Sequence, residues 1–176
     1  MWLNVKFLDA DGALIAELGA YDWDTADLIE NDTKVYEPKF GMTSEMGKLT
    51  NLPAGQSFHL VLNNTILLDN RIPPMGFTNA AFEAINSEPV GYTYADGQYW
   101  DDTLYDIPDG ATQAVATLYH QTSTKEYIEF LRDANMTDKN GQIAYDQWVI
   151  GGKSPPIVMD SGLIDLDDTN TIPGDV

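Results

Sequence analysis

The chain of 176 residues contains no cysteine. This absence excludes disulfide bonds, zinc–thiolate sites and a catalytic thiol. It also excludes covalent haem attachment of the c type, because that attachment requires a Cys-x-x-Cys-His motif. Cysteine-free chains occur on both sides of membranes, so the absence alone leaves the compartment open.

Basic residues are also scarce, since 9 Lys and Arg stand against 28 Asp and Glu and the formal net charge is −19. We expect no nucleic-acid binding, because phosphate neutralisation requires clustered Lys and Arg. Anionic membrane surfaces would repel the chain for the same reason. The expected ligands are cations or neutral molecules, although such a charge also serves simply to keep an exported protein soluble.

Long apolar runs are missing as well. No stretch approaches the roughly 18 apolar residues of a membrane-spanning helix, so we expect no membrane insertion. Residues 1–4 do not form a signal peptide, and Met1 directly precedes a predicted strand. This favours a domain excised from a longer protein. With 43% apolar residues the chain is nevertheless able to bury a core.

Short segments of alternating polarity predict a mainly β protein. The predicted strands are residues 2–8, 13–18, 34–40, 57–63 and 111–119. The first two form a hairpin, because the turn residues Asp, Ala, Asp and Gly separate them. Many short strands joined by long loops are typical of a β-sandwich with jelly-roll or Greek-key connections, and this is the predicted fold.

One segment predicts a capped helix at about residues 123–134. Ser123 and Glu126 have the spacing of a capping box, in which the two side chains satisfy each other's backbone N–H groups. Apolar residues follow at helical spacing.

We expect one β-sandwich domain, residues 1–159, followed by an acidic linker or tail, residues 160–176. The tail is poor in large apolar residues. Its last four residues, Pro173 to Val176, resemble the lead-in to a dockerin-type repeat. A further module is therefore expected after it in the longer protein.

The segment 94–109, YADGQYWDDTLYDIPD, contains five aspartates, four large aromatic residues and no basic residue. Ca²⁺ takes six to eight oxygen ligands, so such a segment offers a calcium-binding loop. The candidate ligands are Asp96, Asp101, Asp102, Asp106 and Asp109. The competing interpretation is a solvated loop in which Tyr99, Trp100 and Tyr105 bury their rings and the aspartates cap turns.

Five aromatic residues lie in segments predicted as loops or edges, namely Trp23, Tyr92, Tyr94, Tyr99 and Trp100. Exposed rings stack on sugar faces, so an alternative function is a carbohydrate-binding module for a neutral glycan. Such rings also serve as core or loop anchors. A glycoside hydrolase is a third interpretation, which requires two carboxyl groups about 5 to 9.5 Å apart across a cleft.

Arg71 is one of two arginines and precedes two prolines in this acidic chain. Because Arg pairs with carboxylates through two parallel hydrogen bonds, we expect Arg71 to fix its loop through a buried or half-buried ion pair.

Several segments resemble the C-terminal, non-haem region of exported multihaem cytochrome c family proteins. They are DNRIPP (69–74), GFTNAAF (76–82), YADGQYWDDT (94–103), LY (118–119) with KEYIEFLRD (125–133), and GKSPP (152–156). The resemblance covers residues 34–158 and implies an extracytoplasmic, β-rich accessory domain. It implies no haem here, because the chain has no cysteine and no haem motif.

The sequence therefore predicts a non-catalytic structural or interaction domain of an exported, multi-domain protein. Its expected partners are neighbouring domains or a neutral glycan, and calcium is the expected stabilising ion of its acidic loops.

Overall fold

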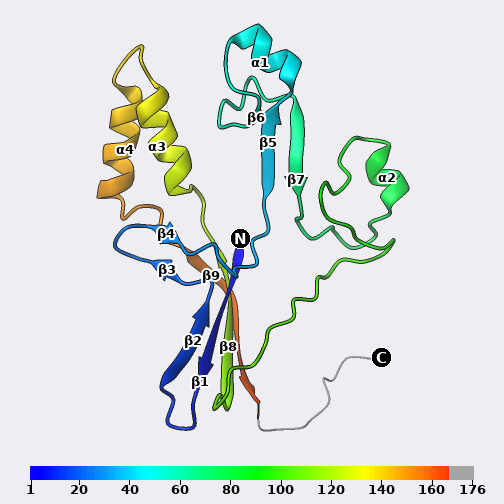
Figure 1. Ribbon diagram of the computed structural model, residues 1–176, viewed down its shortest axis with the longest axis vertical. Coiled ribbons are helices and arrows are strands. Elements are labelled where there is room, and N and C mark those ends of the chain that lie inside the picture. Colours follow the sequence, from blue (N-terminus) through cyan, green and yellow to red (C-terminus); the bar gives the residue numbers. More distant parts are fainter. Residues whose placement is uncertain (167–176) are drawn as a thin grey trace. The chain divides into compact units, whose positions relative to one another are not determined.

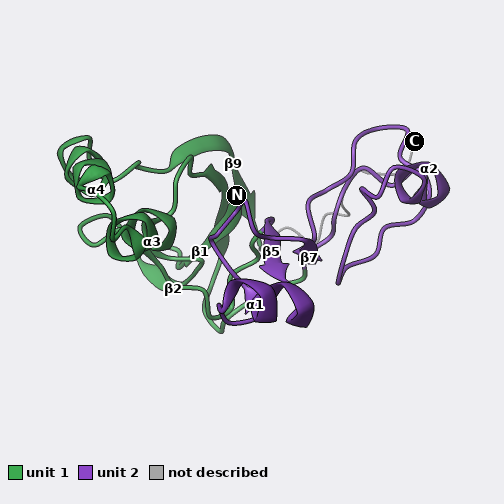
Figure 2. Ribbon diagram, turned by 90° about the horizontal axis from the view of Figure 1, so that it is seen from above, with its two compact units in different colours: residues 1–35, 104–176 green, residues 36–103 purple. Residues whose placement is uncertain are grey.

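The computed structural model describes residues 1–166 (Figure 1). The chain divides into two compact units, which Figure 2 shows in different colours. Unit 1 contains residues 1–35 and the chain from residue 104 onward, and unit 2 contains residues 36–103. Unit 2 is therefore an insertion between two parts of unit 1.

Unit 1 is built on a four-stranded antiparallel sheet with the strand order β2-β1-β8-β9. Its strands are β1 (Trp2–Leu8), β2 (Leu14–Leu18), β8 (Gln113–His120) and β9 (Ile157–Asp165). The predicted hairpin is confirmed as β1 and β2, and the predicted strand 111–119 is confirmed as β8. The Asp9 carboxylate fixes the hairpin turn by accepting hydrogen bonds from the Asp11 and Ala13 N–H groups, at 2.9 and 2.8 Å.

The core of unit 1 lies on one face of this sheet. Alternation along β1 sends Val5 and Phe7 to that face, where they pack with Ala114 of β8. Partly buried apolar side chains surround this cluster, namely Ala16, Leu18, Tyr105, Ala111, Ala116 and Leu166. Burial on one face fixes the register, because a slip of one residue would turn these side chains to the other face.

A two-stranded antiparallel ribbon follows the hairpin. Its strands are β3 (Tyr21–Asp22) and β4 (Asp27–Leu28). The chain enters the ribbon through Gly19, whose φ is 69° and where a Cβ would lie 2.2 Å from the Leu3 carbonyl oxygen. Only glycine fits this bend. Trp2 Nε1 and Asn4 Nδ2 both donate to the Gly19 carbonyl, at 3.2 and 3.0 Å, so the bend also satisfies two buried polar groups.

Two helices complete unit 1, and they are α3 (Lys125–Ala134) and α4 (Asn140–Ile150). The predicted helix is confirmed as α3, but its N-cap is Thr124 and not Ser123. The Thr124 backbone is extended, and its hydroxyl accepts a hydrogen bond from the Tyr127 N–H at 3.4 Å. The capping box predicted from Ser123 and Glu126 was wrong by one position, because the third residue after the true cap is a tyrosine without a carboxylate.

The two helices lie side by side (Figure 1), and they are in close contact at Gly141 of α4. A Cβ on Gly141 would lie 2.1 Å from the Leu131 carbonyl oxygen of α3. The Arg132 guanidinium lies over the Tyr145 ring, 4.3 Å from its centroid, which adds a cation–π contact between the helices. Trp148 of α4 is buried.

Unit 2 contains a three-stranded antiparallel sheet with the order β6-β5-β7, and two short helices. The elements are β5 (Pro38–Met42), α1 (Ser44–Thr50), β6 (Gly55–Gln56), β7 (Thr65–Asp69) and α2 (Asn79–Glu83). Phe77 is 0% exposed, and its ring meets the Phe82 ring edge-on with centroids 4.8 Å apart. This aromatic pair is the buried centre of the segment that carries α2.

The described residues form a mixed α and β structure with three antiparallel sheets, and they show neither a β-sandwich nor a jelly roll. The predicted strand 57–63 is a series of turns. The reason is local, because the Ser57 hydroxyl accepts from the His59 N–H at 3.0 Å and the Asn63 side chain donates to the Ser57 carbonyl at 2.7 Å. The predicted boundary at residue 159 falls inside β9, and residues 167–176 of the predicted tail, with its dockerin-like end, lie outside the described residues.

Candidate functional site

The acidic and aromatic segment 94–109 has no regular secondary structure. Its five aspartates are divided between the two units: Asp96, Asp101 and Asp102 belong to unit 2, and Asp106 and Asp109 belong to unit 1. Asp102, Asp106 and Asp109 are exposed.

Asp96 stabilises the start of α2. Its Oδ1 accepts hydrogen bonds from the Asn79 backbone N–H at 2.8 Å and from Asn79 Nδ2 at 2.9 Å. These two bonds hold the pKa of Asp96 below its usual value. Asn79 Nδ2 also donates to the Tyr94 carbonyl at 3.0 Å, so one side chain ties the loop to the helix.

Asp101 accepts hydrogen bonds from two phenol groups. Tyr36 Oη donates to Oδ2 at 3.1 Å, and Tyr92 Oη donates to Oδ1 at 2.8 Å. Tyr94 is only 3% exposed, and its Oη donates to the Asn70 carbonyl at 2.7 Å. The ring of Tyr94 is therefore an anchor of the loop and does not present a face to a ligand.

No group of three or more His, Asp or Glu side chains that could hold a metal ion occurs among residues 1–166. The carboxylates of Asp96 and Asp101 are instead engaged in the hydrogen bonds just described. Bound calcium would stabilise the folded state by mass action, so its removal would lower the melting temperature. Because residues 1–166 contain no such group of ligands, we expect EDTA to leave the melting temperature of the protein unchanged. Differential scanning calorimetry with EDTA, and then with excess Ca²⁺, checks this expectation. A lower melting temperature that Ca²⁺ restores and Mg²⁺ does not would contradict it.

Tyr99 and Trp100 are both half exposed and lie in unit 2. Their ring centroids are 5.3 Å apart and their planes make an angle of 90°. Because the rings are perpendicular, they do not offer one flat surface to a sugar. The Gln98 side chain holds this loop by donating to the Trp100 carbonyl at 3.0 Å and accepting from the Ala95 N–H at 2.9 Å.

Arg71 pairs with Asp69, two residues before it. Arg71 Nε donates to Asp69 Oδ1 at 2.8 Å, and Nη2 donates to Oδ2. The hydrogen bonds from Arg71 hold the pKa of Asp69 below its usual value. The Arg71 side chain is 57% exposed and the Asp69 side chain 13% exposed, so the pair joins a guanidinium at the surface of unit 2 to a largely buried carboxylate.

Trp23 lies in unit 1, in the turn that joins β3 to β4. We call this turn, together with the strand residues Asp22 and Asp27 at its two ends, the Trp23 turn (residues 22–27). Trp23 is 59% exposed. The ring contacts the Tyr21 ring at 5.3 Å between centroids and the Tyr119 ring at 6.2 Å, with interplanar angles of 81° and 74°. Two rings therefore contact Trp23 directly, and Trp2 in turn stacks on Tyr119, with 5.4 Å between the ring centroids.

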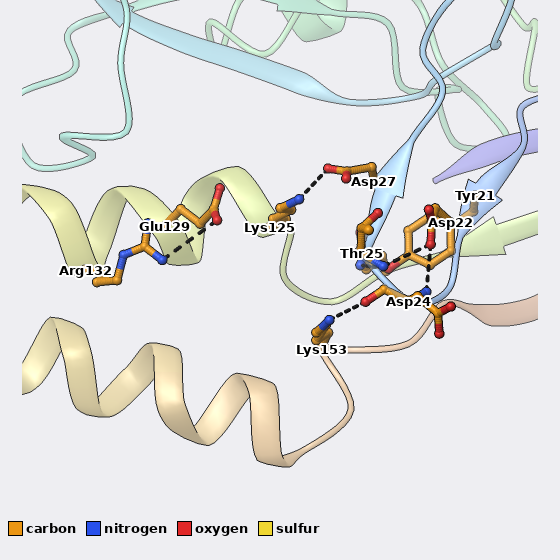
Figure 3. A network of polar contacts seen from close by, with 10 residues as sticks. Tyr21, Asp22, Asp24, Thr25, Asp27, Lys125, Glu129, Arg132 and Lys153 are labelled. Atoms are coloured by element: carbon orange, nitrogen blue, oxygen red, sulfur yellow. Dashed lines mark hydrogen bonds and ion pairs between the residues drawn. The ribbon is translucent and has the colours of Figure 1, made fainter.

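Polar contacts fix the backbone of the Trp23 turn (Figure 3). The Asp22 carboxylate accepts from the Asp24 and Thr25 N–H groups, at 2.8 and 2.9 Å, and these bonds hold its pKa below the usual value. Lys125 at the start of α3 donates to Asp27 at 2.6 Å, which lowers the pKa of Asp27. Lys153, in the loop after α4, donates to the Asp24 carbonyl.

Strand β9 forms an exposed surface that was not predicted from the sequence. All nine of its residues are exposed, and it is the last strand of the sheet. Its large apolar residues are Ile157, Val158, Met159, Leu163 and Ile164. The apolar pattern was visible in the sequence, but the preceding prolines and the two aspartates favoured a loop and a tail.

None of the described helices is long and apolar enough to cross a membrane. No protein-family model matches the chain, and no curated protein is significantly similar to it. Among solved structures, the chain is similar to part of a penta-haem cytochrome c552 from Thermochromatium tepidum, with a TM-score of 0.41 and 11% identity. The match covers 94% of this chain and 30% of the cytochrome, so the chain spans less than a third of that protein. The chain has no cysteine for c-type haem attachment, and the likeness is a partial structural one.

Proposed function

We propose that the chain is a non-catalytic structural and interaction module of an exported, multi-domain protein, and that it binds a strand of another polypeptide along β9. The exposure of β9 supports this proposal. β9 ends the four-stranded sheet, and within residues 1–166 no strand pairs with its outer edge. Such an edge presents unpaired backbone N–H and C=O groups, to which a further strand can be added.

The usable part of this edge is its second half. A bulge interrupts the pairing of β9 with β8 near Met159, and from Asp160 to Asp165 the ladder is regular. A bulge weakens strand addition where it occurs, so we place the docking stretch at residues 160–165. The two apolar side chains there point to opposite faces, because Leu163 lies opposite Val115 and Ile164 lies opposite Ala114.

The side chains of this stretch indicate the chemistry of the partner strand. Asp160 and Ile164 lie on one face, and Leu163 and Asp165 lie on the other. Neither aspartate has an ion pair within the described part of the chain. A partner strand therefore fits when it carries a basic residue opposite each aspartate and an apolar residue opposite each apolar one. The net charge of −19 disfavours a second copy of the chain as this partner.

A designed antiparallel peptide tests the proposal. The capped hexapeptide Lys-Val-Val-Thr-Thr-Lys places lysine opposite Asp165 and Asp160 and valine opposite Ile164 and Leu163. We expect it to shift the amide NMR signals of β9, whereas Glu-Val-Val-Thr-Thr-Glu should not. We also expect binding to weaken when salt rises from about 0.05 to about 0.5 M, because the ion pairs are exposed.

Matched variants locate the binding surface. Leu163→Lys should abolish peptide binding, since it puts a cation opposite a valine and near the peptide's own lysines. Leu14→Lys is the control, because Leu14 is a similarly exposed leucine on β2, the other edge strand, with 55% exposure against 62% for Leu163. Equal binding of both peptides, or equal loss in both variants, would refute the assignment. Self-association in ultracentrifugation without peptide binding would assign the edge to a second copy instead.

A further inference from the structure

We infer that the Trp23 turn is a binding site for a neutral oligosaccharide, with the Trp23 indole as the surface on which a sugar ring stacks. This inference is independent of the proposal for β9. It rests on the exposure of the ring, on the rigidity of the turn and on the charge around it.

The indole of Trp23 is available to a ligand and supported from behind. Trp23 is 59% exposed, and its interplanar angles to Tyr21 and Tyr119 are 81° and 74°, so no ring within residues 1–166 is stacked flat on it. The face of an aromatic ring carries partial negative charge, and the C–H groups of a pyranose face carry partial positive charge. The perpendicular tyrosines fix the tilt of the indole without covering it with a parallel ring.

The backbone under Trp23 is held before any ligand arrives. The Ala26 N–H donates to the Asp22 carbonyl at 2.8 Å, and Ala26 adopts a φ of 62° with its side chain buried. The Asp22 carboxylate caps the turn, and Lys125 and Lys153 hold it from α3 and from the loop after α4 (Figure 3). A pre-organised ring loses little conformational entropy on binding, which raises the affinity of a small contact.

The polar groups beside the ring favour hydroxyl groups over charged ones. Asp24 follows Trp23 and is exposed, and Figure 3 shows its carboxylate pointing away from Lys153. A carboxylate accepts hydrogen bonds from sugar hydroxyls. The turn carries three carboxylates, on Asp22, Asp24 and Asp27, and two lysines contact it from α3 and from the loop after α4, so the local balance of charge is acidic. Anionic sugars would be repelled, and neutral sugars would not.

The test uses neutral and anionic hexasaccharides and the indole N–H signals of the four tryptophans. Cellohexaose, maltohexaose and mannohexaose are titrated into ¹⁵N-labelled protein, with hexagalacturonate as the anionic control. The Trp23 signal is assigned from its disappearance in Trp23→Phe. We expect at least one neutral hexasaccharide, and not hexagalacturonate, to shift this signal.

Variants then separate the Trp23 turn from the other exposed aromatic pair. Trp23→Ala should weaken binding at least about tenfold, as measured by titration calorimetry. Trp100→Ala, at a half-exposed tryptophan in unit 2, should not change it, and neither should Leu163→Lys on β9. The inference would be overturned if none of the three neutral hexasaccharides shifted the indole N–H signal of Trp23. It would also be overturned by binding that Trp100→Ala abolishes and Trp23→Ala leaves intact, because that result would assign the site to Tyr99 and Trp100.

Discussion

Replacing Phe77 with alanine should lower the free energy of unfolding of unit 2 by about 3 to 5 kcal/mol, the usual cost of truncating a buried phenylalanine. Phe77 is 0% exposed, and its ring packs edge-on against Phe82. The backbone of Phe77 also makes a contact with a neighbouring loop, because its carbonyl accepts a hydrogen bond from the Gly97 N–H at 2.7 Å. The Phe77 backbone therefore holds the loop that carries Asp96. Since small domains are stable by only about 5 to 15 kcal/mol, this loss removes a large fraction of the stability of unit 2.

Urea unfolding followed by circular dichroism and by tyrosine and tryptophan fluorescence measures this loss. Met75→Ala is the matched control, because Met75 lies in the same loop and is 79% exposed. We expect that control to change stability by less than about 0.5 kcal/mol. A loss below about 1 kcal/mol for Phe77→Ala would show that the surrounding chain collapses onto the vacated space.

Gly141→Ala should destabilise unit 1 even though alanine is the better helix former. In an exposed helix the exchange would gain about 1 kcal/mol. Here the new Cβ would lie 2.1 Å from the Leu131 carbonyl oxygen and 3.0 Å from the Arg132 Cα, and both contacts are with backbone atoms. The two helices must separate to admit a methyl group, and overpacking of this kind costs about 1 to 3 kcal/mol or more. The steric cost therefore exceeds the gain in propensity.

Thermal unfolding of Gly141→Ala, followed by circular dichroism at 222 nm, measures whether the steric cost exceeds the gain in helix propensity. The control is Gly162→Ala on β9, where a Cβ would meet nothing within 4 Å. We expect a lower melting temperature for Gly141→Ala and no loss for Gly162→Ala. An unchanged melting temperature in Gly141→Ala would mean that α3 and α4 are not held at the distance that the structure shows.

The elements that the sequence predicts well are those with a local cause. The hairpin of β1 and β2 follows from alternation and a turn fixed by Asp9, and α3 follows from a cap and an apolar stripe. Residues 57–63 alternate equally well, yet Ser57 and Asn63 close turns with their side chains. The helix α1 was not predicted, because seven residues are too few to show helical periodicity.

In the candidate site, too, the sequence could not predict contacts between residues that are distant along the chain. The sequence identified Asp96, Asp101 and Tyr94 as a dense group of polar and aromatic residues. It could not show that Asn79 and Tyr36 satisfy the two aspartates, because these partners lie 17 and 65 residues away along the chain. The competing interpretation assigned the anchoring rings to Tyr99, Trp100 and Tyr105, but Tyr99 and Trp100 are half exposed and the buried ring of this loop is Tyr94.

The insertion of unit 2 sets the order in which a growing chain can fold. β1 leaves the ribosome before unit 2, whereas β8, with which it pairs, is synthesised only after unit 2. Until then β1 and β2 form a lone hairpin, which is marginally stable in water. Unit 2 has all its own strands once residue 103 has emerged, so it can fold while unit 1 is still incomplete. The sheet closes last, through pairings distant in sequence that form slowly, and β9 is the final strand to join it.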